Sequence, residues 1–354
     1  MRTPQWWSFI DSVKTGSAQA GANAKVLGLY EVELPERKIQ DHIADIGFNL
    51  LKKQDINSKI NQTLEQMSQT LFKSWFVDFD PVIDNALDAG NPIPEALQTR
   101  TKLRQKVRNS ADFKPLPAEI RSLFPSEFEE TELGWVPKGW DVVKTEDIAI
   151  KIGMGPFGSN IKASQFVSSG IPIINGQQLK GLILEKNFIN YITDEHANIL
   201  KNSLVYEHDI VLTHRGTLGQ VSLIPKRKGN EKFVISQSQF YLRVDRKKCS
   251  PFYMIHFLKS RIGQEALLSN ASQVGVPSIA RPSTHLKKIT FINPPLSLHK
   301  LFDNEFEVIL EKIMNCKEQS LALTALRDTL LPKLISGELS LEDLPDLTTD
   351  TEAA

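Results

Sequence analysis

Two segments of this sequence repeat each other 259 positions apart, and each has the pattern of a long helix. The first is QTLEQMSQTLFKSWF at residues 62–76, and the second is LALTALRDTLLPKLI at residues 321–335. The same shift places Pro35 on Pro294, and each proline opens a segment that ends at the repeated block. Solenoid repeats run about 20–50 residues, which is far shorter. The spacing therefore predicts two copies of one long helix with a whole domain between them.

The first helix, expected from about residue 36 to residue 76, has the periodicity of a coiled-coil seam. Heptad a positions are Ile43, Leu50, Asn57, Leu64 and Leu71. Heptad d positions are Ile39, Ile46, Lys53, Ile60 and Met67. Eight of these ten residues are apolar, which favours a seam between two helices over a simple amphipathic stripe. An ordinary pair of core helices is the alternative.

The second helix keeps the a positions more cleanly than the d positions. Its a positions are Phe302, Ile309, Cys316, Leu323 and Leu330. At d, Leu298 and Leu326 are apolar, whereas Glu305, Lys312 and Gln319 are not. Phe306 and Ile313 add apolar surface at the neighbouring e position. A helix of about 40 residues is roughly 60 Å long, so such a pair can act as a spacer. Asn57 at an a position would set the register.

The net charge of zero is a cancellation between two parts of the chain. Residues 135–295 hold 21 Lys+Arg and 11 Asp+Glu, a net of +10. The remainder holds 21 and 31, a net of −10. This asymmetry predicts a polyanion-binding domain on an acidic frame. The chain has no apolar run long enough to span a bilayer and no signal-peptide pattern, and its two cysteines give no disulfide framework. We expect a cytoplasmic protein.

Composition and repeats divide the chain of 354 residues into six parts. They are a closing remnant of a first domain (1–34), a first long helix (35–78), a proline-rich linker with a short basic helical piece (79–134), a central domain (135–295), a second long helix (296–340) and an acidic tail (341–354). The remnant is inferred because GSAQAGANAKVLGLYEVELP parallels NASQVGVPSIARPSTHLKKITFINPP, which closes the central domain. Gly16-Ser17 and Gly275 would occupy comparable turns.

The central domain alternates short β-rich runs with glycine turns. The expected strands lie within 170–176, 180–186, 208–216, 220–226 and 232–244. One helix is expected from about Pro251 to Asn270, with proline in its first turn. The fold class is therefore α+β: one mostly β domain plus two long helices that pair as a coiled coil.

Several blocks, in this order, resemble the specificity subunits of Type I restriction-modification systems. The central helix ends in FKSWFVDFDPV and the distal helix in LRDTLLPKLISGEL. The central domain carries ELGWVPKGWDVVKTEDIA, IGMGPFGSNIK, GIPIINGQQLKG and DIVLTHRGTLGQ, which resemble that family's target-recognition domain. The resemblance covers the chain from about residue 20 onward.

The resemblance implies a non-catalytic DNA-recognition subunit. In that family two recognition domains, held apart by two antiparallel helices, each read half of a bipartite DNA site. The helices dock modification subunits that methylate adenine, and a restriction subunit adds ATP-driven translocation and cleavage. S-adenosylmethionine, ATP and Mg are thus expected in partner subunits and no cofactor in this chain. This chain has one complete recognition domain, so pairing with a second copy or with a complementary chain is expected.

Polar side chains in the turns of the central domain are the candidate DNA contacts. Asn and Gln can pair bidentately with adenine, Arg with guanine or phosphate, and Thr with phosphate. The candidates are Gly158, Ser159, Asn160, Lys162, Asn175, Gln177, Gln178, His214, Arg215, Thr217, Gln237, Gln239 and Arg281. Gln237 and Gln239 are expected on one face of a strand. The alternatives are structural: glycines that need positive φ, amides that cap a turn, and a solvated hairpin tip at 226–228.

Two short patterns in the sequence suggest functions other than DNA recognition. Asn293-Pro294-Pro295 mimics an amino-methyltransferase signature, but Leu296 replaces the stacking aromatic and no cofactor loop precedes it. A self-contained DNA adenine methyltransferase is therefore disfavoured. Asp78 and Asp80 could bind metal, but without acidic or lysine partners at nuclease spacing they fit the end of the helix better. A remnant that docks modification subunits without reading DNA is the third hypothesis.

Overall fold

The computed structural model describes residues 4–15, 21, 23–31, 34–226, 231–272 and 274–340. The chain divides into two compact units, Met1–Thr63 with Glu311–Ala354 and Leu64–Leu310. Each unit combines its own share of two long helices with other elements, and the predicted α+β class is confirmed. The predicted acidic tail, the turn at Gly16-Ser17 and most of the hairpin tip at 226–228 lie outside the described residues. Within the described residues, none of the helices is long and apolar enough to cross a membrane.

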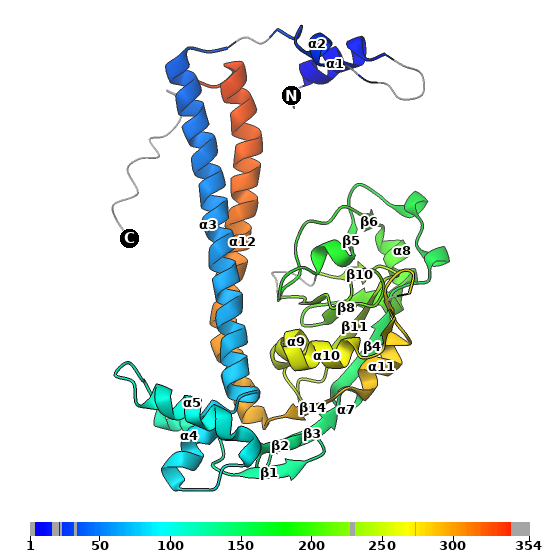
Figure 1. Ribbon diagram of the computed structural model, residues 1–354. Coiled ribbons are helices and arrows are strands. Elements are labelled where there is room, and N and C mark those ends of the chain that lie inside the picture. Colours follow the sequence, from blue (N-terminus) through cyan, green and yellow to red (C-terminus); the bar gives the residue numbers. More distant parts are fainter. Residues whose placement is uncertain are drawn as a thin grey trace. The chain divides into compact units, whose positions relative to one another are not determined.

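The two long helices, α3 (Arg37–Phe76) and α12 (Leu296–Ser336), pair antiparallel (Figure 1). In the first unit Gln54 Nε2 donates to Thr324 Oγ1 at 2.7 Å. Three residues further along α3, Asn57 Nδ2 lies 3.4 Å from the Cys316 carbonyl oxygen. Partner numbers on α12 thus fall as numbers on α3 rise, as in an antiparallel pair. Asn57 is 2% exposed, so its amide is buried in the seam, as the heptad pattern predicts.

The second row of the α3 seam was assigned to the wrong positions. The a residues Ile43, Leu50, Asn57, Leu64 and Leu71 are buried or half-buried. Of the predicted d residues, Ile39, Lys53, Ile60 and Met67 are exposed. The e residues Gly47, Gln54, Asn61 and Ser68 are buried or half-buried instead. Spacings of three and of four both continue a helical stripe, so the apolar d row misled the assignment. On α12, Phe306, Ile313 and Leu334 at e are buried, together with Phe302 at a and Leu298 at d.

Substituting one residue from each row of α12 in the first unit tests this seam. Ile313 is 0% exposed at e, whereas Leu326 is 46% exposed at d. Ile313→Ala should lower the free energy of unfolding by about 2–5 kcal/mol, because it leaves a cavity in the seam. Leu326→Ala should cost less than about 1 kcal/mol. Urea unfolding followed by circular dichroism measures both, and equal losses would show that Leu326 packs in the seam, as the d row predicts.

Segments before α3 form two short helices, α1 (Pro4–Val13) and α2 (Ala24–Leu27). Between them Thr15 and Gly21 form an isolated antiparallel bridge. The ring of Tyr30 packs edge-on against Trp6, with centroids 5.1 Å apart, and also contacts Phe9. A helix, a hairpin-like bridge and a second helix follow one another here, and the central domain ends with the same succession.

In the second unit an aromatic cluster joins the long helices to the central domain. Phe72 and Phe76 of α3 each place their rings 5.1 Å from the ring of Tyr253 on α9 (Pro251–Lys259). Phe302 of α12 packs edge-on against Phe76 at 5.4 Å. All four side chains are at most 3% exposed. Aromatic pairs in this geometry contribute beyond the area they bury, so the cluster fixes α9 against both helices.

Buried His256 on α9 adds a polar contact to α3. Its Nδ1–H donates to the Phe252 carbonyl at 2.6 Å, and its Nε2 lies 3.0 Å from Ser68 Oγ. Burial lowers the pKa of His256 from 6.5 to about 4. Between pH 6.5 and pH 4 the unfolded chain therefore binds a proton that the folded chain does not. Stability falls as the pH drops through this window.

His256→Gln should reduce this acid sensitivity, because glutamine does not titrate. Between pH 7 and pH 4.5 the variant should lose about 2–3 kcal/mol less unfolding free energy than the parent chain. His299, whose pKa burial also lowers to about 4, is present in both proteins and cancels in the comparison. Urea titrations at the two pH values measure the difference. An identical loss in both proteins would show that His256 is not the group responsible.

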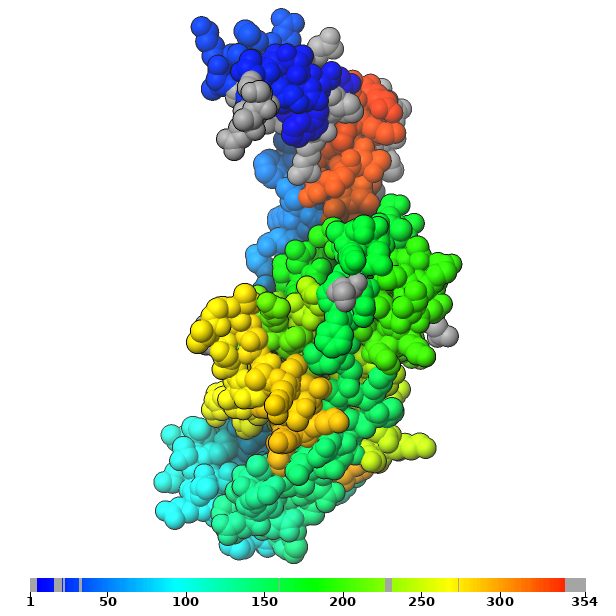
Figure 2. All heavy atoms as spheres, turned by 90° about the vertical axis from the view of Figure 1, so that its right-hand side faces the viewer, coloured from blue at the N-terminus to red at the C-terminus, as the bar shows by residue number. Residues whose placement is uncertain are grey.

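Residues 79–134, predicted to be a linker, contain regular structure. After α3 ends at Phe76, Asp80 does not simply terminate it but begins a new helix. The elements are α4 (Asp80–Ala89), η1 (Glu95–Leu97), α5 (Gln98–Arg108), α6 (Ala118–Arg121), β1 (Phe128–Thr131) and β2 (Gly134–Pro137). In Figure 2 the cyan α4 and α5 lie against the sea-green segment that carries β1 and β2. The basic helical piece predicted near residues 100–108 corresponds to α5.

An ion-pair ladder holds α4 to α5. Arg100 Nε donates to Asp80 Oδ1 at 2.7 Å, and one turn further Arg104 Nε donates to Asp84 Oδ1 at 2.9 Å. The third rung joins Arg108 to Asp88. Asp80 and Asp84 are largely buried, so bidentate guanidinium partners are needed to offset their desolvation. The sequence pattern did not reveal this role, because the partners lie 20 residues apart.

The central domain contains two four-stranded sheets. The strands are β3 (Asp141–Lys144), β4 (Ala149–Met154), β5 (Ile171–Ile174), β6 (Tyr191–Ile192), β7 (Leu204–Val205), β8 (Ile210–Thr213), β9 (Val221–Leu223), β10 (Phe233–Ile235), β11 (Gln239–Val244), β12 (Ala271–Ser272), β13 (Ser278–Ile279) and β14 (Thr290–Asn293). One sheet has the order β6-β5-β10-β7 and the other β4-β11-β8-β9. Ile174, Phe233 and Tyr241, from strands of both sheets, lie in one shared core. The last strand, β14, pairs antiparallel with β3.

Helices and turns complete this domain. They are α7 (Thr145–Ile148), η2 (Gly158–Asn160), η3 (Ala163–Gln165), η4 (Gly176–Gln178), α8 (Asp194–Ile199), η5 (Lys201–Ser203), α10 (Arg261–Leu268) and α11 (Pro282–Lys288). Two predictions were wrong. The single helix at 251–270 is α9 plus α10, broken at Ser260, whose hydroxyl caps α10. Residues 180–186 form no strand and pair only through an isolated bridge at Ile183, so apolar content alone misled the assignment.

Candidate nucleic-acid interface

A polar hollow of about 370 Å³ lies where β5, β8 and β10 end. The side chains and backbone that line it come from three turns: η4 after β5, the turn between β8 and β9, and the turn between β10 and β11. The lining residues are Asn175, Gly176, Gln177, Lys180, Thr213, Arg215, Thr217, Gln220, Ser236, Ser238 and Gln239. All are polar residues or glycine. Five of them, Asn175, Gln177, Arg215, Thr217 and Gln239, are among the candidates chosen from the sequence.

Half-buried Gln220 and buried Gln239 fix the floor of this hollow through their amides. Gln220 Nε2 donates to the Gly176 carbonyl at 3.0 Å, and its Oε1 accepts from Thr213 Oγ1 at 3.1 Å. Gln239 is 1% exposed; its Oε1 accepts from Ser236 Oγ, and its Nε2 lies 3.4 Å from Thr213 Oγ1. These bonds tie together the three turns that form the hollow. The rim is therefore held by side chains that are themselves satisfied.

The rim presents the groups that remain available to a ligand. Gln177, Lys180, Arg215 and Thr217 are exposed, and Asn175 is half-buried. Asn175 Oδ1 accepts from the Gln177 backbone N–H at 2.9 Å, which orients its amide at the turn. An exposed guanidinium, an ammonium and two amides within one hollow can meet both the anionic backbone and the base edges of a nucleic acid.

Three candidate amides differ from expectation. Gln178 is 0% exposed; its Oε1 accepts from the Asn175 N–H and its Nε2 donates to the Asn187 carbonyl. It therefore caps η4, the structural alternative. Gln237 and Gln239 do not share a strand face, because Gln237 lies in the turn before β11. Gln237 is exposed, whereas Gln239 is buried. In a turn, the sequence does not distinguish an amide that will be buried from one that will be exposed.

His214 supports this turn. Its Nε2 lies 3.1 Å from the Gln237 carbonyl oxygen, and the ring is half-buried against Phe240. Burial is the main cause that lowers its pKa below 6.5, so the neutral imidazole is favoured at neutral pH. Its Nε2–H can donate to that carbonyl. A neutral, bonded ring holds the turn in place but is a poor phosphate partner.

The glycines before the η2 turn are needed for close packing, not for positive φ. A Cβ on Gly153 would lie 2.3 Å from the Tyr241 ring. A Cβ on Gly155 would lie 1.9 Å from the Ser236 carbonyl oxygen, while its N–H donates to the Gln239 carbonyl at 2.9 Å. Neither has a positive φ. The loop is thus pinned against the β10–β11 turn, a close approach that no residue spacing predicts.

The remaining candidates surround the hollow without lining it. Gly158, Asn160 and Lys162 are exposed on the η2 loop, and Ser159 lies there too. Arg281 is exposed at φ +46, just before α11. Its segment approaches the hollow because Ser278 forms a bridge with Arg215. Six lining residues were not among the candidates: Gly176, Lys180, Thr213, Gln220, Ser236 and Ser238. The first four stand in the blocks that resemble the family, which was the available signal.

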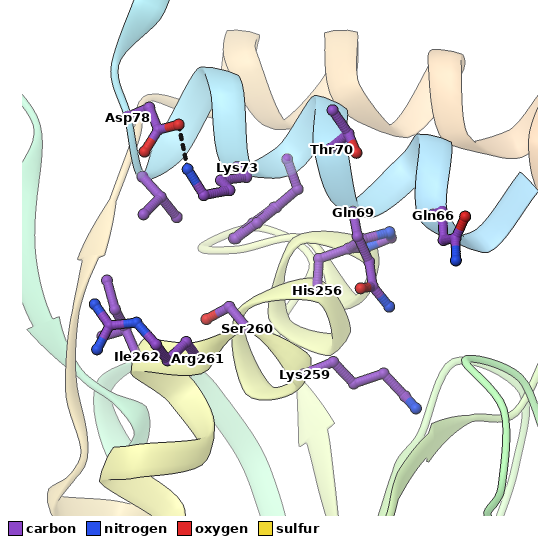
Figure 3. A pocket seen from close by; sticks show the side chains of 12 residues that line it. Gln66, Gln69, Thr70, Lys73, Asp78, His256, Lys259, Ser260, Arg261 and Ile262 are labelled. Atoms are coloured by element: carbon purple, nitrogen blue, oxygen red, sulfur yellow. Dashed lines mark hydrogen bonds and ion pairs between the residues drawn. The ribbon is translucent and has the colours of Figure 1, made fainter. Parts of the chain in front are cut away.

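A second cavity of about 410 Å³ lies between α3 and the α9–α10 helices. Figure 3 shows Gln66, Gln69 and Thr70 on one wall and Lys259 and Ser260 on the other. Lys73 pairs with Asp78 at one end. Burial lowers the pKa of Lys259. None of these residues was among the sequence candidates, because they are distributed between a helix face and a helix junction.

Gly155→Ala tests whether the loop needs its close approach. The added methyl would meet backbone at 1.9 Å, so we expect a loss of about 3 kcal/mol in unfolding free energy. Gly158→Ala is the matched control, because its Cβ would meet the amide end of exposed Gln237 at 2.7 Å, which can move. Chemical denaturation of both variants gives the values. A control as costly as Gly155→Ala would argue against the packing explanation.

Residues 137–316, just over half of the chain, match the family described as Type I restriction modification DNA specificity domain. The HindI specificity subunit of a Type I restriction enzyme from Haemophilus influenzae is 27% identical in an alignment that covers 95% of this chain and 75% of that protein. The MjaIX specificity subunit from Methanocaldococcus jannaschii is 24% identical over 351 residues, with 97% and 68% covered.

Among solved structures, the S subunit of a Type I restriction-modification system from M. genitalium aligns with a TM-score of 0.47 at 13% identity. The alignment covers 92% of this chain and 69% of that one. The family match and the curated relatives confirm the resemblance stated from the sequence, and they place this chain with specificity subunits and not with catalytic ones. The chain belongs to the family of Type I restriction-modification DNA specificity domains.

Proposed function

We propose that this chain is the non-catalytic DNA-recognition subunit of a Type I restriction-modification complex and that its polar hollow reads a half-site. The observation that carries the proposal is the convergence of five sequence candidates on one hollow, in a domain that matches a DNA specificity family. The net charge of +10 over residues 135–295 supports binding to a polyanion.

The hollow offers chemistry for both base and backbone contacts. The exposed amide of Gln177, with that of Asn175 beside it, can pair with an adenine edge. The Arg215 guanidinium can pair bidentately with guanine. Lys180 and Thr217 at the rim suit phosphate oxygens. Because half-buried Gln220 and buried Gln239 hold the turns, the backbone of the rim need not be ordered on binding.

The long helices would dock the catalytic partners. On α3 in the first unit, Ile39, Ile56 and Ile60 are between 38% and 41% exposed. On α12 in the same unit, Leu321 and Leu326 are 49% and 46% exposed. Apolar side chains left outside a helix seam are suited to a protein partner. We assign this surface to modification subunits. A restriction subunit would join the complex, and a second copy or a complementary chain would supply the other half of the recognition. S-adenosylmethionine, ATP and Mg would be held by the catalytic partners.

Arg215→Gln tests the hollow directly. A target duplex is first selected from a randomised library by the complex with unaltered recognition subunit. The substitution should weaken binding to that duplex by about 1–3 kcal/mol, with little change on unrelated DNA, because base readout is lost. Fluorescence anisotropy at fixed salt measures both affinities.

Lys102→Gln is the control for charge alone. Lys102 is exposed on α5, outside the hollow, and the substitution removes the same unit of charge. It should leave discrimination between target and unrelated DNA unchanged. If Arg215→Gln also left discrimination unchanged, the hollow would not be the recognition site.

A further inference from the structure

The loop beside the hollow exposes one aromatic ring. Phe157 is 84% exposed, at the start of the η2 turn. Exposing so large an apolar side chain forfeits about 2 kcal/mol or more of burial free energy. A mobile loop could turn the ring inward. Whether the exposed ring reflects a function therefore depends on how firmly the backbone around Phe157 is held.

The backbone on both sides of Phe157 is anchored. Buried Pro156 precedes it, and the Gly155 N–H donates to the Gln239 carbonyl at 2.9 Å. After it, the Asn160 N–H donates to the Phe157 carbonyl at 2.8 Å. The Asn160 carbonyl oxygen lies 3.0 Å from His196 Nε2, on α8. These contacts hold the ring on a fixed turn that points it into solvent.

The anchored turn lies next to the hollow. Gly158 sits against the Gln237 side chain, and Gly155 sits against the Ser236 carbonyl. Ser236 and Ser238, on either side of Gln237, line the hollow. Exposed Asn160 and Lys162 follow on the same loop and provide a donor amide and an ammonium group. An apolar tip is thus flanked by groups that suit phosphates.

We propose that Phe157 inserts its ring at a base step of the bound duplex and acts as an apolar wedge beside the half-site contacts. The inference rests on the proposed DNA-reading function. Side chains of this type partly unstack a base step and kink the duplex, and phosphate contacts on either side hold the distorted backbone. Lys162 and Asn160 are placed on the loop to make those contacts. Specificity would then include how easily a sequence unstacks at that step.

The test measures affinity and bending of the target duplex together. The full-length chain in its complex is titrated against the selected duplex carrying a fluorophore at each end, and energy transfer reports the bend. Phe157→Ala should weaken binding about tenfold and straighten the duplex, because the wedge is gone. The slope of log affinity against log salt should not change, because no phosphate contact is removed. Phe157→Leu should retain most of the bend.

Ile150→Ala is the matched control, because Ile150 is 64% exposed on β4, several residues before the anchored turn. It should leave affinity and bend unchanged. Phe157→Ala that binds and bends like the parent would overturn the wedge. A loss of affinity with an unchanged bend would overturn it too, since the ring would then only touch the groove surface. A parent complex that fails to distinguish the selected duplex from a scrambled one would instead refute the proposed function.

Discussion

Packing of aromatic rings between the long helices and α9 is the constraint on which the second unit depends. Phe72 and Phe76 on α3, Tyr253 on α9 and Phe302 on α12 come from three distant parts of the sequence and bury one another almost completely. Core aromatics of this kind typically contribute about 3–5 kcal/mol each when truncated to alanine. The cluster therefore makes the helix ends part of the same folded core as the recognition domain. The polar contact between His256 and Ser68 also joins α9 to α3 within this packing.

In the central domain, turns from the two sheets line one hollow. Under the proposed function, the role of the domain depends on a division between polar groups that hold the turns and polar groups that remain exposed. The amides of Gln220 and Gln239 form hydrogen bonds that hold the turns together, whereas Gln177 and Arg215 remain exposed on the rim. Preorganisation of this kind favours specific readout, because the turns that carry the rim side chains are already in place when the ligand arrives. The proposed wedge at Phe157, on its anchored turn, would add the shape of the DNA to what is recognised.

The sequence predicted the features that depend on long regular patterns. The seven-residue recurrence of apolar side chains identified both helices and the buried or half-buried row from Ile43 to Leu71, because helical geometry repeats over many turns. It did not reveal on which side of that row the partner lies, since this depends on α12. The family blocks located two of the three turns that form the hollow, and the turn between β10 and β11 lies in none of them. The sequence could not show that Gln178 faces inward and Gln177 outward, because one residue along a 3₁₀ turn reverses the environment. Gly155 is explained by a contact with Ser236, 81 positions away.

Mapping of methylated adenines tests the central claim most directly. The chain is co-expressed with its modification subunit in a host free of adenine methylation, and the whole genome is sequenced for modified adenines. The account predicts one bipartite motif. A palindromic motif would indicate pairing of two copies, and an asymmetric one a complementary chain. Arg215→Gln should degrade the motif at defined base positions. An assembled complex that methylates no adenine, or one whose motif is unchanged by Arg215→Gln and by alanine at Asn175 and Gln177, would contradict recognition through the hollow.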